Sequence, residues 1–435
     1  MKILLSAPYT RRTKDNLILK AQEILKRRQS LALGILSALT PEQHEIEIID
    51  ENNYSLIDTK KQYDLVAISS ITPHIIRAYK IADEFRARGI PVVLGGYHPS
   101  AMPEEAKQHA DSVVIGEAEE TWPQLLKDFE NDKLKPFYKP RKPVDPKIIP
   151  HAKRDPKRGF FRTEEIQATR GCPYRCAFCA IQNTEGHIFR KRPVENVIDE
   201  IQKLNGKFIF FNDNSLTIDP EYTKELFMEM KGLNKQFECH GNINVLGEDD
   251  ELLKLSKEAG CKTWWIGFES ISQESINSIG KKTNIVKKYS IAIKKIKKHG
   301  LSVRGMFVFG FDGDTKNIFK DTLKTLKTWN IDIAYFFILT PFPNTPLFKR
   351  LENEERILTK DWSKYNYGNV VFKPKNMTSK ELYEKTRMVA KNFYSFKNTV
   401  QRIFNNKNLD FSGLINKFWH NFLYDRNFIK REYQF

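Results

Sequence analysis

Two long stretches of the sequence alternate short apolar runs with amphipathic helical patterns, and this alternation limits the chain to few folds. Residues 1–130 contain apolar runs with the length of buried parallel strands, at 1–8, 44–51, 64–71, 90–97 and 111–118. Helical patterns lie between them, for example at 76–89. Strands alternating with helices form right-handed βαβ units, so this region is expected to be an α/β domain with a doubly wound, Rossmann-like parallel sheet.

The alternation resumes at about residue 163 and continues to residue 350. The strand candidates are 165–171, 207–213, 237–245, 262–270, 301–311 and 331–341. Successive βα units of this kind predict a partial (β/α)6 barrel, in which functional residues lie at the carboxyl ends of the strands. The intervening residues 131–162 are rich in Pro and Lys without a period, which indicates a linker or a segment draped over the next domain.

The remaining segment, 351–435, is expected to be mostly helical, basic and aromatic. A helix is predicted over 378–405, where Thr378 and Glu381 have the spacing of a capping box. Residues 396–435 mix aromatic and basic side chains, which suits either ordinary packing under the barrel or an amphipathic helix in peripheral contact with a membrane.

Composition excludes several classes of protein. A hydrophobic content of 40% with 12% aromatic residues supports buried cores and argues against disorder. No run approaches the roughly 18 apolar residues of a membrane span, and the short apolar start does not resemble a signal peptide, so a cytoplasmic protein is expected. The net charge of +17 suits an anionic partner or lysine-rich solvated helix faces, and the spread of lysines along the chain favours the second.

Cysteine is concentrated at one place. Cys172, Cys176 and Cys179 form a C-x3-C-x2-C pattern after the first strand of the predicted barrel, whereas Cys239 and Cys261 are predicted core residues. Three thiolates on one loop can hold three irons of a cubane cluster and leave the fourth open, although such clusters usually have four cysteines. Zinc is the alternative, but it prefers four ligands and commonly paired C-x2-C units, and the sequence has no second pair.

The triplet, with aromatic Phe178 before its last cysteine, resembles the radical S-adenosylmethionine (SAM) superfamily. The resemblance implies a [4Fe–4S] cluster on the three cysteines and SAM bound at the open iron. It also implies reductive cleavage of SAM to a 5′-deoxyadenosyl radical, with an external electron donor such as flavodoxin or ferredoxin.

Further motifs follow in that superfamily's order. The resemblance implies SAM contacts at the ends of later strands, from Asp213, Asn214, Gly267, Glu269, Ser270 and Gly310. Gly313 lies in the last of these motifs. Arg170 and Arg175 flank the cysteine loop, where they could neutralise the cluster or the SAM carboxylate.

The run GGYHPSAMPEEAKQHADSVVIGEAEETWPQLL, with ALTPEQHEIEIIDEN before it, resembles the cobalamin (B12)-binding domain that precedes some radical SAM domains. The similarity implies cobalamin contacts in three loops, from Ser69, Ser70, Thr72, Gly95, Gly96, Tyr97, His98, Gly116 and Glu117. The motif D-x-H-x-x-G, whose histidine ligates cobalt in many such domains, is absent, and neither His74 nor His98 lies in one.

The region after residue 357 resembles a subset that includes hopanoid C-methyltransferases. The resemblance implies methylation of an unactivated carbon of a small-molecule or lipid substrate, with methylcobalamin as the methyl donor. Radical cyclisation, rearrangement or oxidation without methyl transfer stays open, as does a non-catalytic cobalamin-binding regulatory protein. A nucleic-acid partner is not expected, because no known RNA-binding module is visible.

Overall fold

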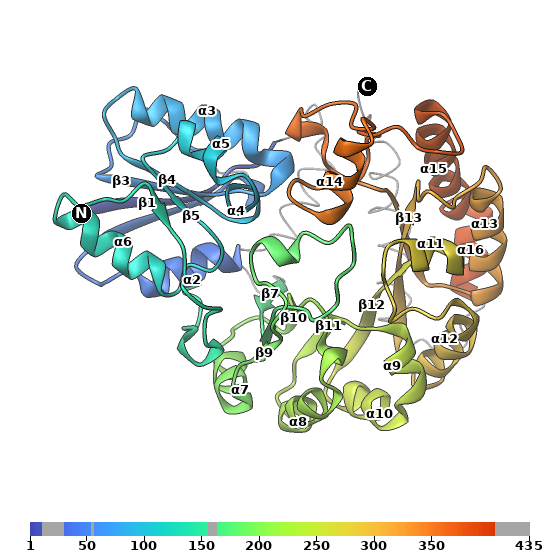
Figure 1. Ribbon diagram of the computed structural model, residues 1–435. Coiled ribbons are helices and arrows are strands. Elements are labelled where there is room, and N and C mark those ends of the chain that lie inside the picture. The colour runs from blue at the N-terminus through green and yellow to red at the C-terminus, as the bar shows by residue number, and fades with distance from the viewer. Residues whose placement is uncertain (11–29, 54–55, 155–162, 405–435) are drawn as a thin grey trace.

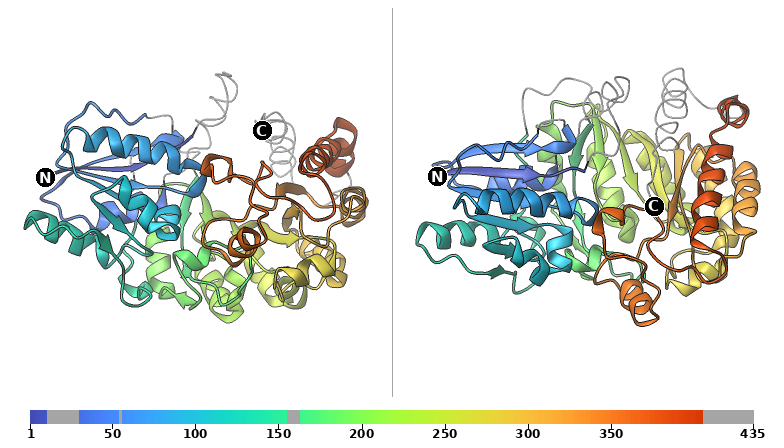
Figure 2. Two further views of the ribbon diagram at one scale, coloured as in Figure 1. Left: turned by 45° about the horizontal axis from the view of Figure 1, so that its top comes forward. Right: turned by 90° about the horizontal axis from the view of Figure 1, so that it is seen from above.

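The computed structural model describes residues 1–10, 30–53, 56–154 and 163–404. It confirms the predicted α/β class: two parallel six-stranded sheets lie side by side, each with its own helices (Figure 1). The C-terminal helices and loops pack against both halves (Figure 2).

The first sheet has the strand order β2-β1-β3-β4-β5-β6. Its strands are β1 (Lys2–Ala7), β2 (Glu45–Asp50), β3 (Leu65–Ser69), β4 (Val92–Gly95), β5 (Ser112–Val114) and β6 (Phe137–Tyr138). Its helices are α2 (Leu31–Leu39), α3 (Ile75–Arg86), α4 (Tyr97–Ala101), α5 (Pro103–Gln108) and α6 (Thr121–Glu130). Helices α2 and α6 cover one face and α3 and α5 the other, so the sheet is doubly wound as predicted.

The segment 131–162 does more than connect. Phe137 and Tyr138 form the edge strand β6 beside β5, and Ile149 packs against Ile35 of α2. The prolines explain why the sequence pattern hid this strand: a strand of two residues bordered by Pro136 and Pro140 shows no alternation, and proline is tolerated at a sheet edge.

The second sheet is ordered β14-β13-β12-β11-β10-β7, which is chain order without closure, so the predicted partial barrel is confirmed. Its strands are β7 (Thr163–Ile166), β10 (Phe208–Phe211), β11 (Gln236–His240), β12 (Cys261–Glu269), β13 (Ser302–Phe309) and β14 (Ile333–Ile338). The helices around it are α7 (Val194–Gln202), α8 (Pro220–Met230), α9 (Ile243–Glu248), α10 (Asp250–Glu258), α11 (Gln273–Ser278), α12 (Tyr289–Lys298) and α13 (Ile318–Trp329).

The first barrel strand is shorter than the sequence predicts. Strand β7 ends at Ile166, and Thr169–Arg170 forms β8, which pairs antiparallel with β9 (Arg190–Lys191). The break has a side-chain cause: the buried Asp213 carboxylate accepts the backbone N–H groups of Ala168 and Thr169, which a continuing ladder would have used. The third strand likewise ends at His240, because Asn242 caps α9.

The C-terminal region contains α14 (Pro346–Asn353), α15 (Ser379–Phe393) and α16 (Phe396–Phe404). The capping box of Thr378 and Glu381 is present. Trp362 and Tyr365, between α14 and α15, join the core of the first domain. Cys239 and Cys261 are fully buried, as predicted. The amphipathic segment expected up to residue 435 lies beyond residue 404 outside the described residues.

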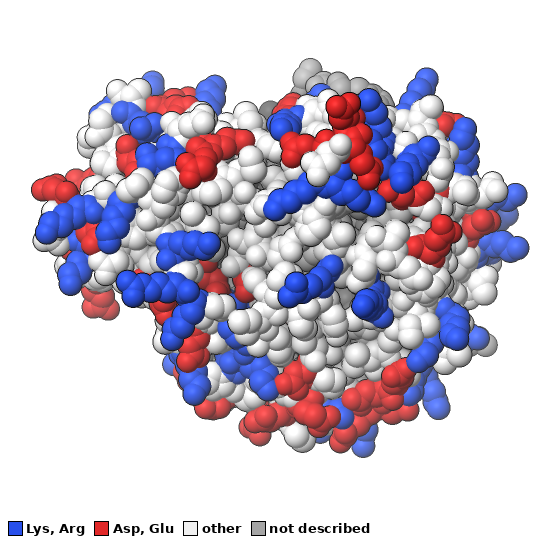
Figure 3. All heavy atoms as spheres, in the orientation of Figure 1, with Lys and Arg blue, Asp and Glu red and all other residues white. Residues whose placement is uncertain are grey.

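The basic residues are spread over the surface, as their spread along the sequence indicates. On the face drawn in Figure 3, lysines and arginines are scattered over both halves and interspersed with acidic residues. Among the described residues, no helix has the length and apolar character needed to cross a membrane.

Candidate functional site

The cysteine loop is held in shape by three distant segments. The Cys172 N–H donates to the Gly186 carbonyl at 3.2 Å, and the Ala177 N–H donates to the Ile279 carbonyl at 2.9 Å. The Ala177 carbonyl accepts the Leu347 N–H at the start of α14, also at 2.9 Å. The backbone of the loop is therefore ordered by protein contacts alone.

The three thiols are free and partly buried. Burial raises the pKa of each of them, that of Cys176 to about 12, and the nearby Lys281 ammonium opposes the rise. Among the described residues, no three His, Cys, Asp or Glu side chains converge closely enough for a single metal ion. Three separate thiols on an ordered loop fit a cluster that takes one cysteine per iron.

Lys281 and Glu269 form a buried ion pair beside this loop. The Lys281 Nζ lies 2.5 Å from Glu269 Oε1 and donates to the Gly267 carbonyl at 2.9 Å. Burial works to lower the Lys281 pKa, but the Glu269 carboxylate and the Cys176 and Cys179 sulfurs outweigh it and raise that pKa. Glu269 has a left-handed backbone with φ of 60°, a strain that favours a functional role.

Sequence reasoning selected Glu269 and Gly267 but missed Lys281. A Cβ on Gly267 would lie 2.7 Å from the Lys281 Nζ, so this glycine makes room for the pair. The sequence did contain a signal for Lys281, which lies just after α11, the helix that follows the Glu269–Ser270 motif. The pair offers a cation and a carboxylate, which suit the carboxylate and ammonium ends of an amino acid.

The other residues predicted to contact SAM all have protein partners in this structure. Burial raises the Asp213 pKa to about 7, and its carboxylate accepts the Thr169 hydroxyl at 2.6 Å. The Ser270 hydroxyl accepts the Ser272 N–H at 3.1 Å, at the start of α11. Gly310 has φ of +106° and packs against Leu382 of α15. Asn214 donates to Glu185 at 2.7 Å, behind the cysteine loop.

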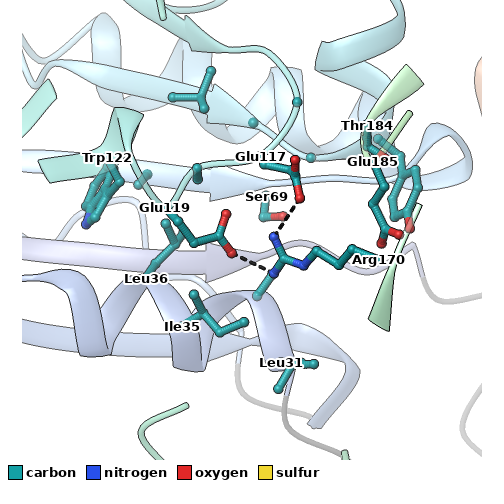
Figure 4. Close-up of a pocket in the computed structure, with 18 of the residues that line it drawn as sticks. Leu31, Ile35, Leu36, Ser69, Glu117, Glu119, Trp122, Arg170, Thr184 and Glu185 are labelled. Atoms are coloured by element: carbon teal, nitrogen blue, oxygen red, sulfur yellow. Dashed lines mark hydrogen bonds and ion pairs between the residues drawn. The ribbon is translucent and has the colours of Figure 1, made fainter. Parts of the chain in front are cut away.

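The first domain contains a cavity of about 230 Å³ at the carboxyl ends of β3, β4 and β5, closed by α2 and α6 (Figure 4). Its lining includes most residues predicted to contact cobalamin: Ser69, Gly95, Gly96, Tyr97, Gly116 and Glu117. Leu31, Ile35 and Trp122 add an apolar wall. Ligands of doubly wound sheets bind at this edge.

Two glycines shape the edge of this cavity. Gly96 has φ of +94°, and a Cβ there would lie 2.8 Å from the Ser70 carbonyl oxygen. Gly116 has φ of +81°, and its Cβ would lie 3.5 Å from the carbonyl oxygen of Thr184 in the barrel domain. Backbone therefore forms this edge, as the close approach of a ligand requires.

The remaining predicted cobalamin residues lie outside the cavity lining. His98 is fully buried in the core, where its ring nitrogens contact Thr72 at 3.3 Å and Glu105 at 3.2 Å. Trp362 packs against its ring with centroids 5.3 Å apart. His98 is therefore a core residue. The Ser70 N–H and carbonyl are bonded within the first domain, to Gly95 and His98.

The cavity and the cysteine loop share a wall. Thr184 and Glu185 line the cavity, whereas the next residue, Gly186, bonds to Cys172. Arg170 also lines the cavity and points toward Glu117 at 3.0 Å and Glu119 at 2.6 Å (Figure 4). Arg175 is exposed on the loop. The two sites are thus adjacent and built partly from the same segment.

Comparisons with known proteins agree with this arrangement. Residues 166–326 match the radical SAM superfamily, 29–126 a B12 binding domain, and 345–414 a domain of unknown function, DUF4070. Bacteriochlorophyllide d C-8(2)-methyltransferase of Chlorobaculum tepidum is 36% identical over 363 residues, which are 79% of this chain and 80% of that protein. Hopanoid C-2 methylase of Rhodopseudomonas palustris is 24% identical over 347 residues, 76% of this chain and 65% of that protein.

Among solved structures, the cobalamin-dependent SAM radical enzyme OxsB with aqua-cobalamin bound is similar in fold. The TM-score is 0.73 at 16% identity, over 98% of this chain and 71% of OxsB. The ordered three-cysteine loop and the glycine-edged cavity fit an iron–sulfur cluster with SAM and a cobalamin, respectively. The chain belongs to the family of cobalamin-dependent radical SAM methyltransferases, enzymes that use a [4Fe–4S] cluster, SAM and cobalamin.

Proposed function

We propose that this enzyme transfers a methyl group to an unactivated carbon of a rigid, largely apolar, polycyclic small molecule. The single observation that carries the proposal is the shared wall between the cavity and the cysteine loop, formed by residues 184–186. When bound, the cluster with SAM supplies a carbon radical and the cobalamin a methyl group, and the protein must hold the two close together.

The chain's own residues would divide the work as follows. Cys172, Cys176 and Cys179 would hold the cluster, and Lys281 with Glu269 would orient the amino-acid end of SAM. The backbone at Gly95, Gly96 and Gly116 would face cobalamin, while Trp122 and Ile35 keep that cavity apolar. The Thr184–Glu185 segment, which lies between the two sites, would fix the position of each cofactor relative to the other.

The substrate class follows from the inward face of the barrel. Outward residues such as Trp264 and Phe268 fill the core under the helices, whereas the inward positions carry a continuous run of rings. The run is Phe210, His240, Trp265, Tyr335, Phe337 and Tyr367. Trp265 and Tyr335 stack with ring centroids 5.4 Å apart, and Tyr367 at the end of the run is 47% exposed.

Flat aromatic walls suit a rigid ring system better than a flexible chain, because little conformational entropy is lost on binding. The two relatives described above are named for a bacteriochlorophyllide and a hopanoid, which are both polycyclic.

The reductant would be an external one-electron carrier such as flavodoxin or ferredoxin. Peripheral contact with a membrane surface, through the segment beyond residue 404, is also part of the proposal.

The test is anaerobic reconstitution with iron, sulfide and hydroxocobalamin, followed by incubation with SAM, a reductant and a zinc chlorin or hopanoid acceptor. The proposal predicts 5′-deoxyadenosine and S-adenosylhomocysteine together, with a methylated acceptor. Deoxyadenosine without S-adenosylhomocysteine would indicate radical chemistry without methyl transfer. A regulatory protein would form neither product.

A further inference from the structure

The two domains meet through a cluster of buried charges. The Arg170 guanidinium lies 3.0 Å from Glu117 and 2.6 Å from Glu119, and Arg190 lies 2.8 Å from Glu117. The four side chains are at most 10% exposed. Both carboxylates belong to the first domain and both arginines to the barrel domain.

Arg170 occupies a special place in this cluster. It ends β8, with only Gly171 between it and Cys172, while its side chain forms part of the cavity wall beside Glu117 and Glu119 (Figure 4). Any molecule that fills the cavity therefore lies against a side chain anchored next to the first cluster ligand.

A second connection runs through Glu185, which also lines the cavity. Its carboxylate accepts the Gly171 N–H at 2.8 Å and the Gln167 amide at 3.1 Å. Gln167 in turn accepts the Arg170 Nε–H at 3.0 Å. Gly171 has φ of +75°, and a Cβ there would collide with the Ile188 carbonyl, so only glycine permits this close approach of the two backbones.

We propose that Arg170 is a positioning residue that couples filling of the first-domain cavity by cobalamin to the geometry of the cysteine loop. Arg170, Glu117 and Glu119 line the cavity, so a ligand there removes the small remaining exposure of their contacts to water and strengthens them. The strengthened contacts fix the backbone at Gly171 and, with it, the position of Cys172. Because coupling is reciprocal, cluster assembly must tighten cobalamin binding by the same factor.

The alternative role for Arg170, neutralising the cluster or the SAM carboxylate, does not match its contacts. Its Nε, Nη1 and Nη2 atoms are bonded to Gln167, Glu117 and Glu119, respectively. The connection from Arg170 to the cysteine loop is the backbone, since only Gly171 separates it from Cys172.

The test measures the dissociation constant for hydroxocobalamin by equilibrium dialysis, in cluster-loaded protein and in the triple variant Cys172→Ala, Cys176→Ala, Cys179→Ala. The wild-type ratio of the two constants is expected to be about 5- to 150-fold. In Arg170→Gln the ratio should fall close to one while the protein still assembles a cluster. Arg356→Gln is the matched control: Arg356 also forms a largely buried ion pair, with Asp312 at 2.7 Å, but lies outside the cavity lining.

A spectrum of the cluster provides the second readout. In the wild type, cobalamin should change the electron paramagnetic resonance spectrum of the reduced cluster before any substrate is added, and in Arg170→Gln the change should be absent. If Arg170→Gln fails to fold, Arg170→Lys serves instead, since it keeps the charge but loses the forked contact and should lower the ratio.

A wild-type ratio of one, or an Arg170 variant with the wild-type ratio, overturns the proposal. The inference depends on the two cofactors and not on methyl transfer. Because neither readout requires substrate or turnover, its failure is distinguishable from a failure of the proposed function.

Discussion

The two parallel sheets finish their carboxyl edges in different ways. At the carboxyl edge of the first sheet the backbone itself forms the surface. Gly96 and Gly116 adopt positive φ there, and because they have no side chains, space is left for the cavity. The second ends in reactive side chains, with the thiols of the cysteine loop near the Lys281–Glu269 pair. The first edge therefore offers a cavity bordered by backbone and apolar side chains, and the second offers thiols and a charged pair as specific contact atoms.

The largest effect should come from removing one of those specific atoms. Cys176→Ala should lose the cluster and, with it, all detectable 5′-deoxyadenosine, while hydroxocobalamin still binds with the affinity of cluster-free protein. Iron analysis and product chromatography check this. Cys261→Ala is the control, because that sulfur is buried behind the sheet, and it should keep its iron. A Cys176→Ala protein with full iron content would refute the assignment.

The corresponding change at the first edge is Gly96→Ala. With φ of 94° and ψ of −167°, Gly96 lies in a region essentially restricted to glycine, where a Cβ costs about 1–3 kcal/mol, and the contact with the Ser70 carbonyl at 2.8 Å adds to this cost. Cobalamin affinity should fall at least about tenfold while iron content is kept.

Variants of two other glycines separate the effect of positive φ on cobalamin affinity from the effect of the close backbone contact. Gly89→Ala carries the positive φ with no atom within 4 Å, and Gly95→Ala brings only an ordinary contact of 3.6 Å with Val114. Neither control should lose cobalamin to the extent that Gly96→Ala does. Equal losses in all three would show that the cavity edge is not set by close backbone approach.

Lys281→Met tests whether the ion pair at the second edge binds SAM. Removing one partner of a buried charge pair costs about 2–5 kcal/mol, so the dissociation constant for SAM should rise about 30-fold or more. Calorimetry on the cluster-loaded protein measures it. Lys282→Met is the neighbouring control, because Lys282 is exposed and should leave SAM affinity unchanged. An unchanged affinity in Lys281→Met would remove the pair from the SAM site.

The smallest effect on the protein is expected at Thr378, which is part of neither the cavity lining nor the cysteine loop. Thr378→Ala breaks the capping box of α15 and should lower the free energy of unfolding by about 1 kcal/mol. Cobalamin, iron and SAM binding should be unchanged once the protein is folded, as thermal unfolding with and without each ligand would show. A loss of cofactor binding would mean that α15 supports the site directly, for instance through Leu382 against Gly310.

The difference between the edges also explains what the sequence could predict. Alternating strands and helices are a local pattern, so the fold could be predicted, and the equally local cysteine spacing predicts the cluster ligands. Gly96 and Gly116, selected because small residues at strand ends have a local signature, lie in the cavity lining. The sequence did not show that His98 is buried, because its burial depends on Trp362, more than 250 residues away in the chain.

Arg170 and Asp213 show the same limit. Arg170 is adjacent to the cluster loop in sequence but turns toward Glu117 and Glu119, carboxylates supplied by another domain. Asp213 lies at a strand end, where ligand contacts are expected, yet it accepts bonds from Ala168 and Thr169. A sequence shows that a charged residue lies near a site, but its direction depends on tertiary partners.

The measurement that tests the central claim most directly is the magnetic interaction between the two metal centres in one chain. The protein would be reconstituted with cluster and cob(II)alamin, and the relaxation of the cobalt signal recorded with the cluster oxidised and then reduced. A shared wall between the sites predicts faster cobalt relaxation when the cluster is paramagnetic. A cobalt signal indifferent to the reduction of a fully assembled cluster would contradict the account.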